Sequence, residues 1–299
     1  MHRKIIFTAA ILLLGARLAL AGGANGAKAL NLDAGARPAG MGEAFTAVSD
    51  DSNALYYNPA GIAQLESPEA ALTYFRGIVD ENVGQLALSG KIGGIGKFGL
   101  GAMFYDGGNL EWNRLDGTSV TVKAQKDISV NLGYGVEAFK NLSIGLGVKY
   151  LSSKLVEKYS ATAFAGDIGL LYKTGIEGLS AGAAVQNAGT KLKYLNTGDS
   201  LTMNIRGGIS YGRKILEEHS FIAALDAVKP GDGRLAGSMG VEYSYLESYF
   251  LRCGHRFNND LNRFALGAGY RTMGVGLDYA ITALSSISPI HRVSVTYKF

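Results

Sequence analysis

The residue types that carry out enzymatic chemistry are present in this chain of 299 residues, but their spacing does not suit it. Residues 94–99 have the glycine spacing of a dinucleotide-binding turn, yet they lead into a predicted strand where that turn requires a helix. His219, His255 and His291 fall on separate predicted strands or strand ends, and none has a second ligand at metal-site spacing. The chain also lacks the Gly-x-Ser-x-Gly turn of serine hydrolases. We therefore expect no enzyme active site, no metal and no cofactor.

Charged residues at alternating positions are the other candidates, and their chemistry is ion pairing. Ten of them occupy the small or polar side of predicted strands: Lys91, Asp127, Lys149, Asp167, Arg206, Asp226, Glu242, Arg252, Arg271 and Asp278. Hydrocarbon offers no partner to a polar group, so in a membrane barrel the apolar side faces lipid and these residues face the lumen. The five positive and five negative groups nearly cancel. This balance predicts ion pairs among themselves and with a plug rather than an ion-selective pore.

Strands with a two-residue period must position these groups, and they fill the chain from residue 67 onward. In residues 127–136, for example, Ile128 and Val130 alternate with Ser129 and Asn131. Fourteen such segments are predicted, at 68–77, 82–92, 96–106, 127–139, 142–154, 160–173, 178–188, 201–213, 218–228, 234–246, 248–257, 263–271, 274–284 and 290–299. Short connections alternate with longer ones, the asymmetry of an outer-membrane barrel. The predicted fold is all-β, a transmembrane antiparallel β-barrel over residues 67–299, and a soluble all-β fold is the less favoured alternative.

The first 21 residues have the pattern of a secretory signal peptide. Arg3 and Lys4 precede an apolar run over residues 5–16, and Ala19-Leu-Ala21 supplies a cleavage site after Ala21. The apolar run is too short to cross a bilayer as a helix. Three of the 29 basic residues lie in this leader, so 26 remain against 25 acidic residues in the mature chain. This near-neutral balance gives no indication of a nucleic-acid partner.

A short segment of helical character precedes the strands. Met41, Ala44, Phe45 and Val48 recur at helical spacing, which predicts one helical piece there. Residues 49–52 are polar and are expected to end this piece and cap the next one. The paired acids at 50 and 51 are better explained as such caps than as catalysts.

The second half of this segment contains a proline that fits the first turn of a helix. Pro59 also holds Asn58 out of helical geometry. We expect residues 22–66 to fold as a helical plug, or hatch, inside the barrel. Its candidate site residues are Met41, Phe45, Asp50, Asp51, Tyr56, Tyr57, Asn58, Pro59, Ala60 and Gly61. A helical hairpin leaning on the outside of a β-domain is the alternative that residue types alone leave open.

Glycines gather on the inward side of the predicted strands. They are Gly133, Gly135, Gly145, Gly147, Gly208, Gly267, Gly269, Gly274 and Gly276. Small residues there leave room for a plug or for strong curvature, which we favour over a wider ligand passage. Trp112, in the longest connection, either contacts a partner or folds over the barrel mouth.

The last predicted strand ends on an aromatic residue. Val293, Val295, Tyr297 and Phe299 alternate with polar residues. This pattern resembles the signal that the barrel assembly machinery of the outer membrane reads, so we expect these four residues to act as a membrane-assembly signal.

Two runs in the hatch segment resemble a known family. They are Ala34-Gly-Ala-Arg-Pro-Ala-Gly-Met-Gly-Glu-Ala-Phe-Thr-Ala-Val-Ser-Asp-Asp51 and Asn53-Ala-Leu-Tyr-Tyr-Asn-Pro-Ala-Gly61. They are similar to the N-terminal signature of the PorV/PorQ family, which belongs with the FadL-type long-chain fatty-acid transporters of the bacterial outer membrane. The resemblance implies a 14-stranded barrel with the hatch inside, in the outer membrane.

The resemblance implies two functions of different class. In the first, the barrel passively takes up hydrophobic small molecules, which enter from the loop side and leave past the hatch. In the second, it is a non-transporting component of type IX protein secretion that binds secreted proteins at the cell surface. A purely structural role is a third alternative. The expected partners are outer-membrane lipid, the barrel assembly machinery, and either a hydrophobic ligand or secreted proteins.

Overall fold

The fold follows from a computed structural model that describes residues 27–77, 80–114, 117–231, 233–257, 263–284 and 287–299. The signal peptide predicted at residues 1–21 lies outside the described residues, as does the start of the predicted hatch at 22–26. None of the described helices has the length and apolarity needed to span a bilayer.

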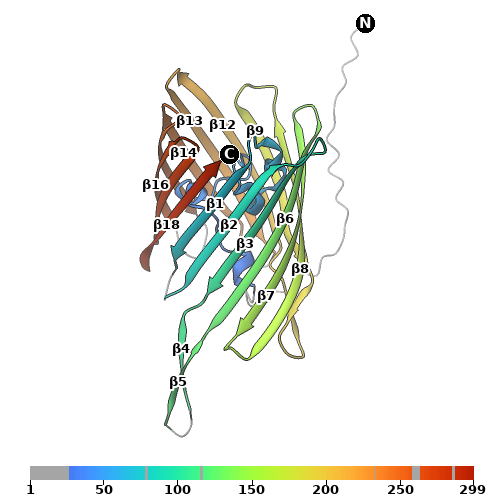
Figure 1. Cartoon of the computed structure of the whole chain (residues 1–299), viewed down its shortest axis with the longest axis vertical. Coiled ribbons are helices and arrows are strands. Elements are labelled where there is room, and N and C mark those ends of the chain that lie inside the picture. The colour runs from blue at the N-terminus through green and yellow to red at the C-terminus, as the bar shows by residue number, and fades with distance from the viewer. Residues whose placement is uncertain (1–26, 78–79, 115–116, 232, 258–262, 285–286) are drawn as a thin grey trace.

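Fourteen antiparallel strands form one closed barrel, as the alternation of the sequence predicts (Figure 1). They are β1 (Glu69–Arg76), β2 (Asn82–Lys91), β3 (Lys97–Asp106), β6 (Gln125–Phe139), β7 (Leu142–Leu155), β8 (Tyr159–Lys173), β9 (Leu179–Gly189), β12 (Asn204–Leu216), β13 (His219–Pro230), β14 (Ala236–Tyr245), β15 (Tyr249–Phe257), β16 (Arg263–Thr272), β17 (Val275–Leu284) and β18 (Ile287–Lys298). The first and last strands close the ring, with Leu72 of β1 opposite Val295 of β18. The predicted all-β barrel fold is therefore confirmed.

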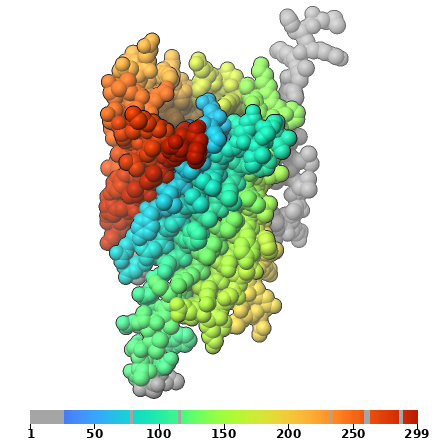
Figure 2. Space-filling view, in the orientation of Figure 1, coloured from blue at the N-terminus to red at the C-terminus, as the bar shows by residue number. Residues whose placement is uncertain are grey.

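The two faces of the wall differ in chemistry, as a barrel in lipid requires. On β8, Ala161 and Ala163 point inward and are buried, whereas Phe164 and Ile168 point outward. Across the neighbouring strands the outward positions are again large and apolar, for example Leu132, which is 58% exposed. Figure 2 shows this outer face as a continuous wall of side chains. An apolar outer surface of this extent has no partner in water and fits hydrocarbon.

The two ends of the barrel differ in their connections. At one end, here called the short-turn end, the strands are joined by short turns such as the one at Lys140 and Asn141. The other end, here called the long-loop end, carries two additional hairpins: β4 (Asn109–Asn113) with β5 (Ser119–Lys123), and β10 (Lys191–Lys193) with β11 (Gly198–Ser200). The sequence predicts both of these segments as loops between strands, so the two hairpins are an addition to the predicted fold. Figure 1 shows the β4–β5 hairpin projecting well beyond the wall.

The hatch lies inside the ring of strands (Figure 1). Its short helices are η1 (Lys28–Leu30), α1 (Ala36–Gly40), α2 (Ala54–Tyr57) and η2 (Pro59–Gln64). Helix α1 contacts β15 to β18, and η2 contacts β6 to β8. The hatch therefore spans the lumen from one side of the barrel to the other. Hence the plug, and not the external hairpin, describes the fold of this segment.

The prediction of a helical piece from the spacing of Met41 and Phe45 is wrong, because the chain there forms turns. Helix α1 ends at Gly40, and the chain then turns through Gly42 and Glu43 at positive φ angles of 60° and 68°. The cause is a tertiary contact. The backbone N–H groups of Phe45 and Thr46 donate to the carboxylate of Asp226 on the barrel wall instead of continuing a helix. Contacts across the lumen therefore override local spacing here.

The hatch backbone touches the wall closely where the wall carries glycine. A Cβ on Gly145 would overlap the backbone of Pro59 and Ala60. A Cβ on Gly254 would likewise overlap the backbone of Met41 and Gly42. The inward glycines at these positions are thus required by the close approach of the hatch. This agrees with the favoured interpretation of the inward glycines.

Candidate functional site

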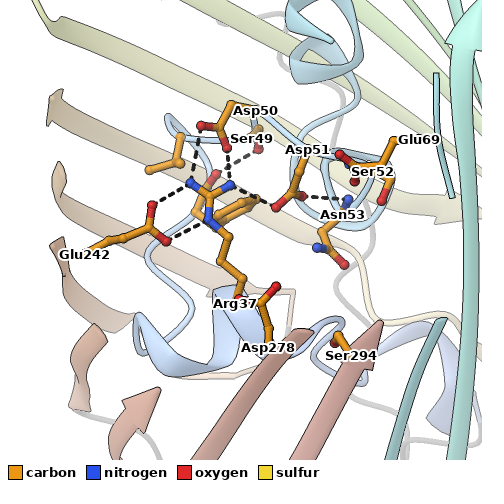
Figure 3. Close-up of polar contacts among 12 residues, drawn as sticks. Arg37, Ser49, Asp50, Asp51, Ser52, Asn53, Glu69, Glu242, Asp278 and Ser294 are labelled. Atoms are coloured by element: carbon orange, nitrogen blue, oxygen red, sulfur yellow. Dashed lines mark hydrogen bonds and ion pairs between the residues drawn. The ribbon is translucent and has the colours of Figure 1, made fainter. Parts of the chain in front are cut away.

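Arg37 of α1 is the centre of an ionic cluster between hatch and wall. Its guanidinium donates from Nε and Nη2 to the two carboxylate oxygens of Glu242, each at 2.8 Å. Its Nη1 donates to Asp50 at 2.5 Å and to Asp51 at 2.9 Å, so three carboxylates surround one cation (Figure 3). The Arg37 side chain is only 5% exposed. A buried charge is tolerated only when it is paired and hydrogen-bonded, as this one is.

The cluster continues along the inner face of the barrel wall. Arg252 of β15 donates from Nε to Glu242 of β14 at 2.5 Å and from Nη1 to Asp278 of β17 at 2.6 Å. All three side chains are 5% exposed or less. Arg37 is therefore bound to a wall network that spans β14, β15 and β17, and it fixes α1 against that side of the lumen.

A second ionic cluster lies nearer the long-loop end. Asp33 of the hatch accepts from Arg263 of β16 at 2.8 Å and lies 3.9 Å from Arg292 of β18. Glu43 of the hatch pairs with Arg256 of β15, whose Nη1 also reaches Asp33 at 3.4 Å. Two hatch carboxylates are thus held by three arginines of the wall.

On β13, which pairs with β14, a wall carboxylate accepts hydrogen bonds from the hatch backbone. Asp226 of β13 accepts from the N–H groups of Phe45 and Thr46 at 3.0 and 2.8 Å, and from the Thr46 hydroxyl at 2.6 Å. Arg206 of β12 lies 4.0 Å from Asp226, and its guanidinium stacks 4.8 Å above the Tyr57 ring. These contacts fix the turn that follows α1.

The Asn-Pro-Ala element fixes the end of the hatch against β8. The Asn58 amide donates to the Thr46 carbonyl at 2.9 Å and to the Leu170 carbonyl at 3.0 Å. Its side-chain oxygen accepts from the Ala60 N–H at 3.1 Å and so caps η2, with Pro59 in the first turn. Asn58 itself is extended, at φ −153°, and the predicted effect of Pro59 is confirmed.

The structure places most of the ten predicted lumen charges inside the barrel. The seven that are 6% exposed or less are Asp127, Lys149, Asp167, Asp226, Glu242, Arg252 and Asp278. Lys149 pairs with Asp167 at 2.8 Å, apart from the hatch clusters. Arg271 is half-buried and stacks on Phe250 at 4.4 Å. Lys91 is exposed, because it is the last residue of β2 and lies at the rim of the short-turn end.

Nine of the ten predicted hatch residues are buried or half-buried in the lumen, and Asp50 is exposed in the short-turn vestibule. Met41, Phe45, Tyr57, Asn58, Pro59, Ala60 and Gly61 are buried, and Tyr56 is half-buried with its hydroxyl donating to the Leu86 carbonyl at 2.8 Å. The capping prediction is confirmed for Asp51 and wrong for Asp50. Asp51 accepts from the Asn53 N–H at 2.9 Å at the start of α2 and also binds Arg37. Asp50 binds Arg37 instead, because a buried guanidinium needs several acceptors.

The residues of the proposed assembly signal lie on the outer surface of the last strand. Val293, Val295 and Tyr297 of β18 are 49%, 43% and 45% exposed, and the terminal Phe299 is 72% exposed. The three strand side chains therefore face away from the lumen, and Phe299 is exposed at the end of the chain.

Sequence reasoning missed several partners in the two clusters. They are Asp33, Arg37, Glu43, Arg256, Arg263 and Arg292. Two of them carried a signal, because Arg256 has the same strand parity as Arg252, and Arg292 alternates with Val293. The hatch residues carried no such signal, since their partners on the wall lie more than 200 positions away in the sequence.

Two vestibules lie on opposite sides of the hatch. The long-loop vestibule, a cavity of about 310 Å³, is lined by hatch residues 30–34 and by the loop-end residues of β12 to β16, including Asn204 and Arg263. The short-turn vestibule, of about 600 Å³, is lined by Arg37, Glu242 and Phe250 among others. Arg37 therefore lies at the floor of one vestibule, and Asp33 at the floor of the other.

Between the two vestibules the hatch fills the lumen. Met41, Phe45 and Tyr57 are at most 2% exposed, and the Phe45 and Tyr57 rings pack edge to face at 5.4 Å. The Tyr57 hydroxyl donates to the Ala34 carbonyl at 3.0 Å, which joins two parts of the hatch. A molecule that passes from one vestibule to the other must displace part of this layer.

Solved structures of transport proteins share this architecture. The toluene transporter TodX of P. putida matches with a TM-score of 0.65 and 14% identity, covering 89% of this chain and 98% of TodX. The toluene transporter TbuX of Ralstonia pickettii matches with a TM-score of 0.62 at 14% identity and the same two coverages. A Pseudomonas aeruginosa FadL homologue gives a TM-score of 0.55 at 13% identity, covering 87% of this chain and 98% of that one. At these identities the likeness establishes the fold, which is that of FadL-type channels.

Sequence comparison gives one match over nearly the whole chain. The profile of an uncharacterised protein family, UPF0164, matches residues 20–299. No curated protein sequence matches the chain.

Proposed function

The chain belongs to the family UPF0164, and from the geometry of its lumen we propose that it is an outer-membrane barrel for the passive uptake of hydrophobic small molecules. They enter the long-loop vestibule, pass the hatch and leave through the short-turn vestibule. Asn58, Pro59 and Ala60 shape the part of the hatch that packs on β7 and β8. No step in this passage requires catalysis or a cofactor.

The outer surface supports the membrane location. The barrel is closed, so its wall leaves no unpaired strand edge to lipid, and its outward side chains are apolar. The solved structures named above include two described as toluene transporters, and their shared fold makes passage of hydrophobic molecules a coherent hypothesis for this chain.

The two vestibules on either side of a single hatch are the observation that carries the proposal. A barrel with only a structural role has no need of a cavity on each side of its plug. A general pore would have an aqueous channel, whereas here buried side chains of the hatch fill the middle of the lumen.

A reversible disulfide between hatch and wall tests the proposal. Ala36 and Ala39 of α1 form one packed cluster with Ala280 of β17, so Ala39→Cys with Ala280→Cys, in a Cys253→Ser background, is designed to join the hatch to the wall on oxidation. Uptake of the hydrophobic fluorophore N-phenyl-1-naphthylamine by intact cells that export the barrel is then measured. We expect uptake to stop in the oxidised protein and to return on reduction. Equal uptake in both states, with the disulfide demonstrated on a gel, contradicts the proposal.

The projecting hairpin favours a second function, a PorV-like component of type IX secretion that binds secreted cargo. Leu110 and Trp112 of β4 are 49% and 50% exposed, beyond the barrel wall (Figures 1 and 2). Exposed aromatic and aliphatic residues on a projecting hairpin suit contact with a protein. Deleting residues 109–123 discriminates between the functions: the deletion abolishes capture of secreted proteins under the second function, and it leaves fluorophore uptake intact under the first.

A further inference from the structure

Large apolar side chains are exposed at the short-turn end of the barrel. Each of the six short turns carries at least one of them, at its tip or on the strand residue beside it, and the end of the chain carries another. They are Ile92, Ile95, Phe139, Ile176, Ile215, Leu216, Leu246, Met273 and Phe299, here called the apolar rim. Met273, in the turn between β16 and β17, is 96% exposed, so almost none of its side chain packs on the protein.

Contact with water does not explain the apolar rim. Burial of a large apolar side chain is favourable by about 1.5–3 kcal/mol relative to full exposure. Single exposed apolar residues are ordinary on protein surfaces, but their recurrence at every short turn indicates a surface that contacts something else.

The apolar rim continues the lipid-facing surface of the wall. Tyr172, Tyr270 and Tyr297 are exposed on strands β8, β16 and β18, close in sequence to members of the rim. The rings of Tyr297 and Phe299 pack edge to face, with centroids 4.8 Å apart. Tyrosines near strand ends form the belts of membrane barrels, and these belts lie at the level of the lipid headgroups. The rim therefore adjoins the headgroup layer.

Charges of both signs accompany the apolar rim. Lys140 follows Phe139 on one turn, and Lys173 and Glu177 flank Ile176 on the next turn, all of them exposed. Phospholipid headgroups carry a phosphate, and zwitterionic ones an ammonium as well, so they offer a partner to either sign. Apolar side chains beside basic ones are typical of protein segments that lie in a membrane interface.

We propose that the apolar rim lies in the headgroup layer of the membrane and binds phospholipid, so that lipid and not water covers the short turns. The rim encircles the closed barrel, as a membrane does, whereas a single docked protein would cover the mouth or one side. Leu246 and Met273 also line the short-turn vestibule, so its mouth opens at the level of the headgroups. The inference goes beyond the uptake function, because it holds whether or not a molecule passes through the barrel.

Cysteines at the turns test what covers them. Met273→Cys and Ile176→Cys are made separately in a Cys253→Ser background, and Glu157→Cys, at an exposed turn of the long-loop end, is the matched control. The purified barrels are placed in phosphatidylcholine nanodiscs, which leave both faces open to solvent. The reaction of each cysteine with a charged, water-soluble methanethiosulfonate is then timed.

We expect the two rim cysteines to react at least about tenfold more slowly than Glu157→Cys, because lipid excludes the charged reagent and disfavours the reactive thiolate. No second protein is present in the nanodiscs, so lipid is the only new cover. Equal rates at Met273→Cys, Ile176→Cys and Glu157→Cys overturn the inference and leave a docked protein as the occupant of the rim.

Tryptophan fluorescence gives a second measurement in the same nanodiscs. The tryptophan of Met273→Trp, in a Trp112→Phe background, is expected to be quenched by phosphatidylcholine brominated close to its headgroup and little by aqueous iodide. Trp112 of the wild type, on the projecting hairpin, is the control and is expected to show the opposite. Quenching of both tryptophans by iodide to the same extent contradicts the inference. Because tryptophan itself favours the interface, the cysteine rates decide if the two measurements disagree.

Discussion

Arg37 of the hatch and Glu242 of the barrel wall form a two-pronged ion pair, with Nε and Nη2 each 2.8 Å from a carboxylate oxygen. The pair joins positions that are 205 residues apart in the sequence, and Glu242 is held in turn by Arg252. It is the contact by which the wall of the barrel and the short-turn side of the hatch are fixed to each other (Figure 3).

Replacing Arg37 with methionine is expected to loosen the hatch. Arg37→Met leaves Asp51 and part of Glu242 without a cation, and breaking a buried pair costs about 3–5 kcal/mol. We expect backbone amides of residues 36–57 to exchange with solvent faster, while amides of the barrel strands stay protected. Hydrogen exchange measured by mass spectrometry checks this. Lys214→Met, which removes an exposed pair with Glu247, is the control and is expected to change nothing in the hatch. An unchanged hatch in Arg37→Met contradicts the assignment.

A methyl group added to the wall under the hatch is expected to destabilise it. In Gly145→Ala the new Cβ overlaps the backbone of Pro59 and Ala60, and overpacking of this kind costs about 1–3 kcal/mol. Gly84→Ala is the matched control on β2, since a Cβ there has nothing within 4 Å. The midpoint of urea unfolding of each variant in lipid vesicles checks the difference. Equal midpoints for the two variants show that the hatch does not rest on Gly145.

Removing the Asp226 carboxylate is expected to release one turn of the hatch and not the rest. Asp226→Ala leaves the N–H groups of Phe45 and Thr46 buried without an acceptor, at a cost of about 1–3 kcal/mol for each such group. Amide exchange is expected to rise over residues 42–48 and to stay low over η2, which packs on other strands. A uniform rise across the whole hatch contradicts this local role and indicates that the hatch opens as one unit.

The barrel itself was predictable from the sequence because its signal is local and repeated. In each strand, apolar and polar residues alternate between the two faces, as Ile128 and Val130 alternate with Ser129 and Asn131. Because lipid surrounds the barrel, only the apolar face can point outward. The hairpin β4–β5 escaped prediction because it projects beyond the wall, where no apolar face enforces a strict pattern. Strands β10 and β11 escaped it because they have three residues each, too few to show an alternation.

The hatch was predictable as a unit but not in its details. Its helical spacing at Met41 and Phe45 was outweighed by hydrogen bonds to Asp226, and the pairing of Asp50 and Asp51 with Arg37 was not predicted. Such contacts join segments far apart in sequence, and nothing in the local pattern identifies the partner. The extended backbone of Asn58 was predictable, because the following Pro59 disfavours helical φ and ψ angles at that residue.

We expect the hatch alone to separate the two vestibules, and single-channel recording in planar bilayers measures whether it does. The wild-type barrel is compared with a variant that lacks residues 36–64, after both are shown to insert as folded barrels. We expect no large steady conductance for the wild type and a steady open channel for the deletion. A large steady conductance in the wild type would contradict it, because the lumen would then be open past Met41, Phe45 and Tyr57.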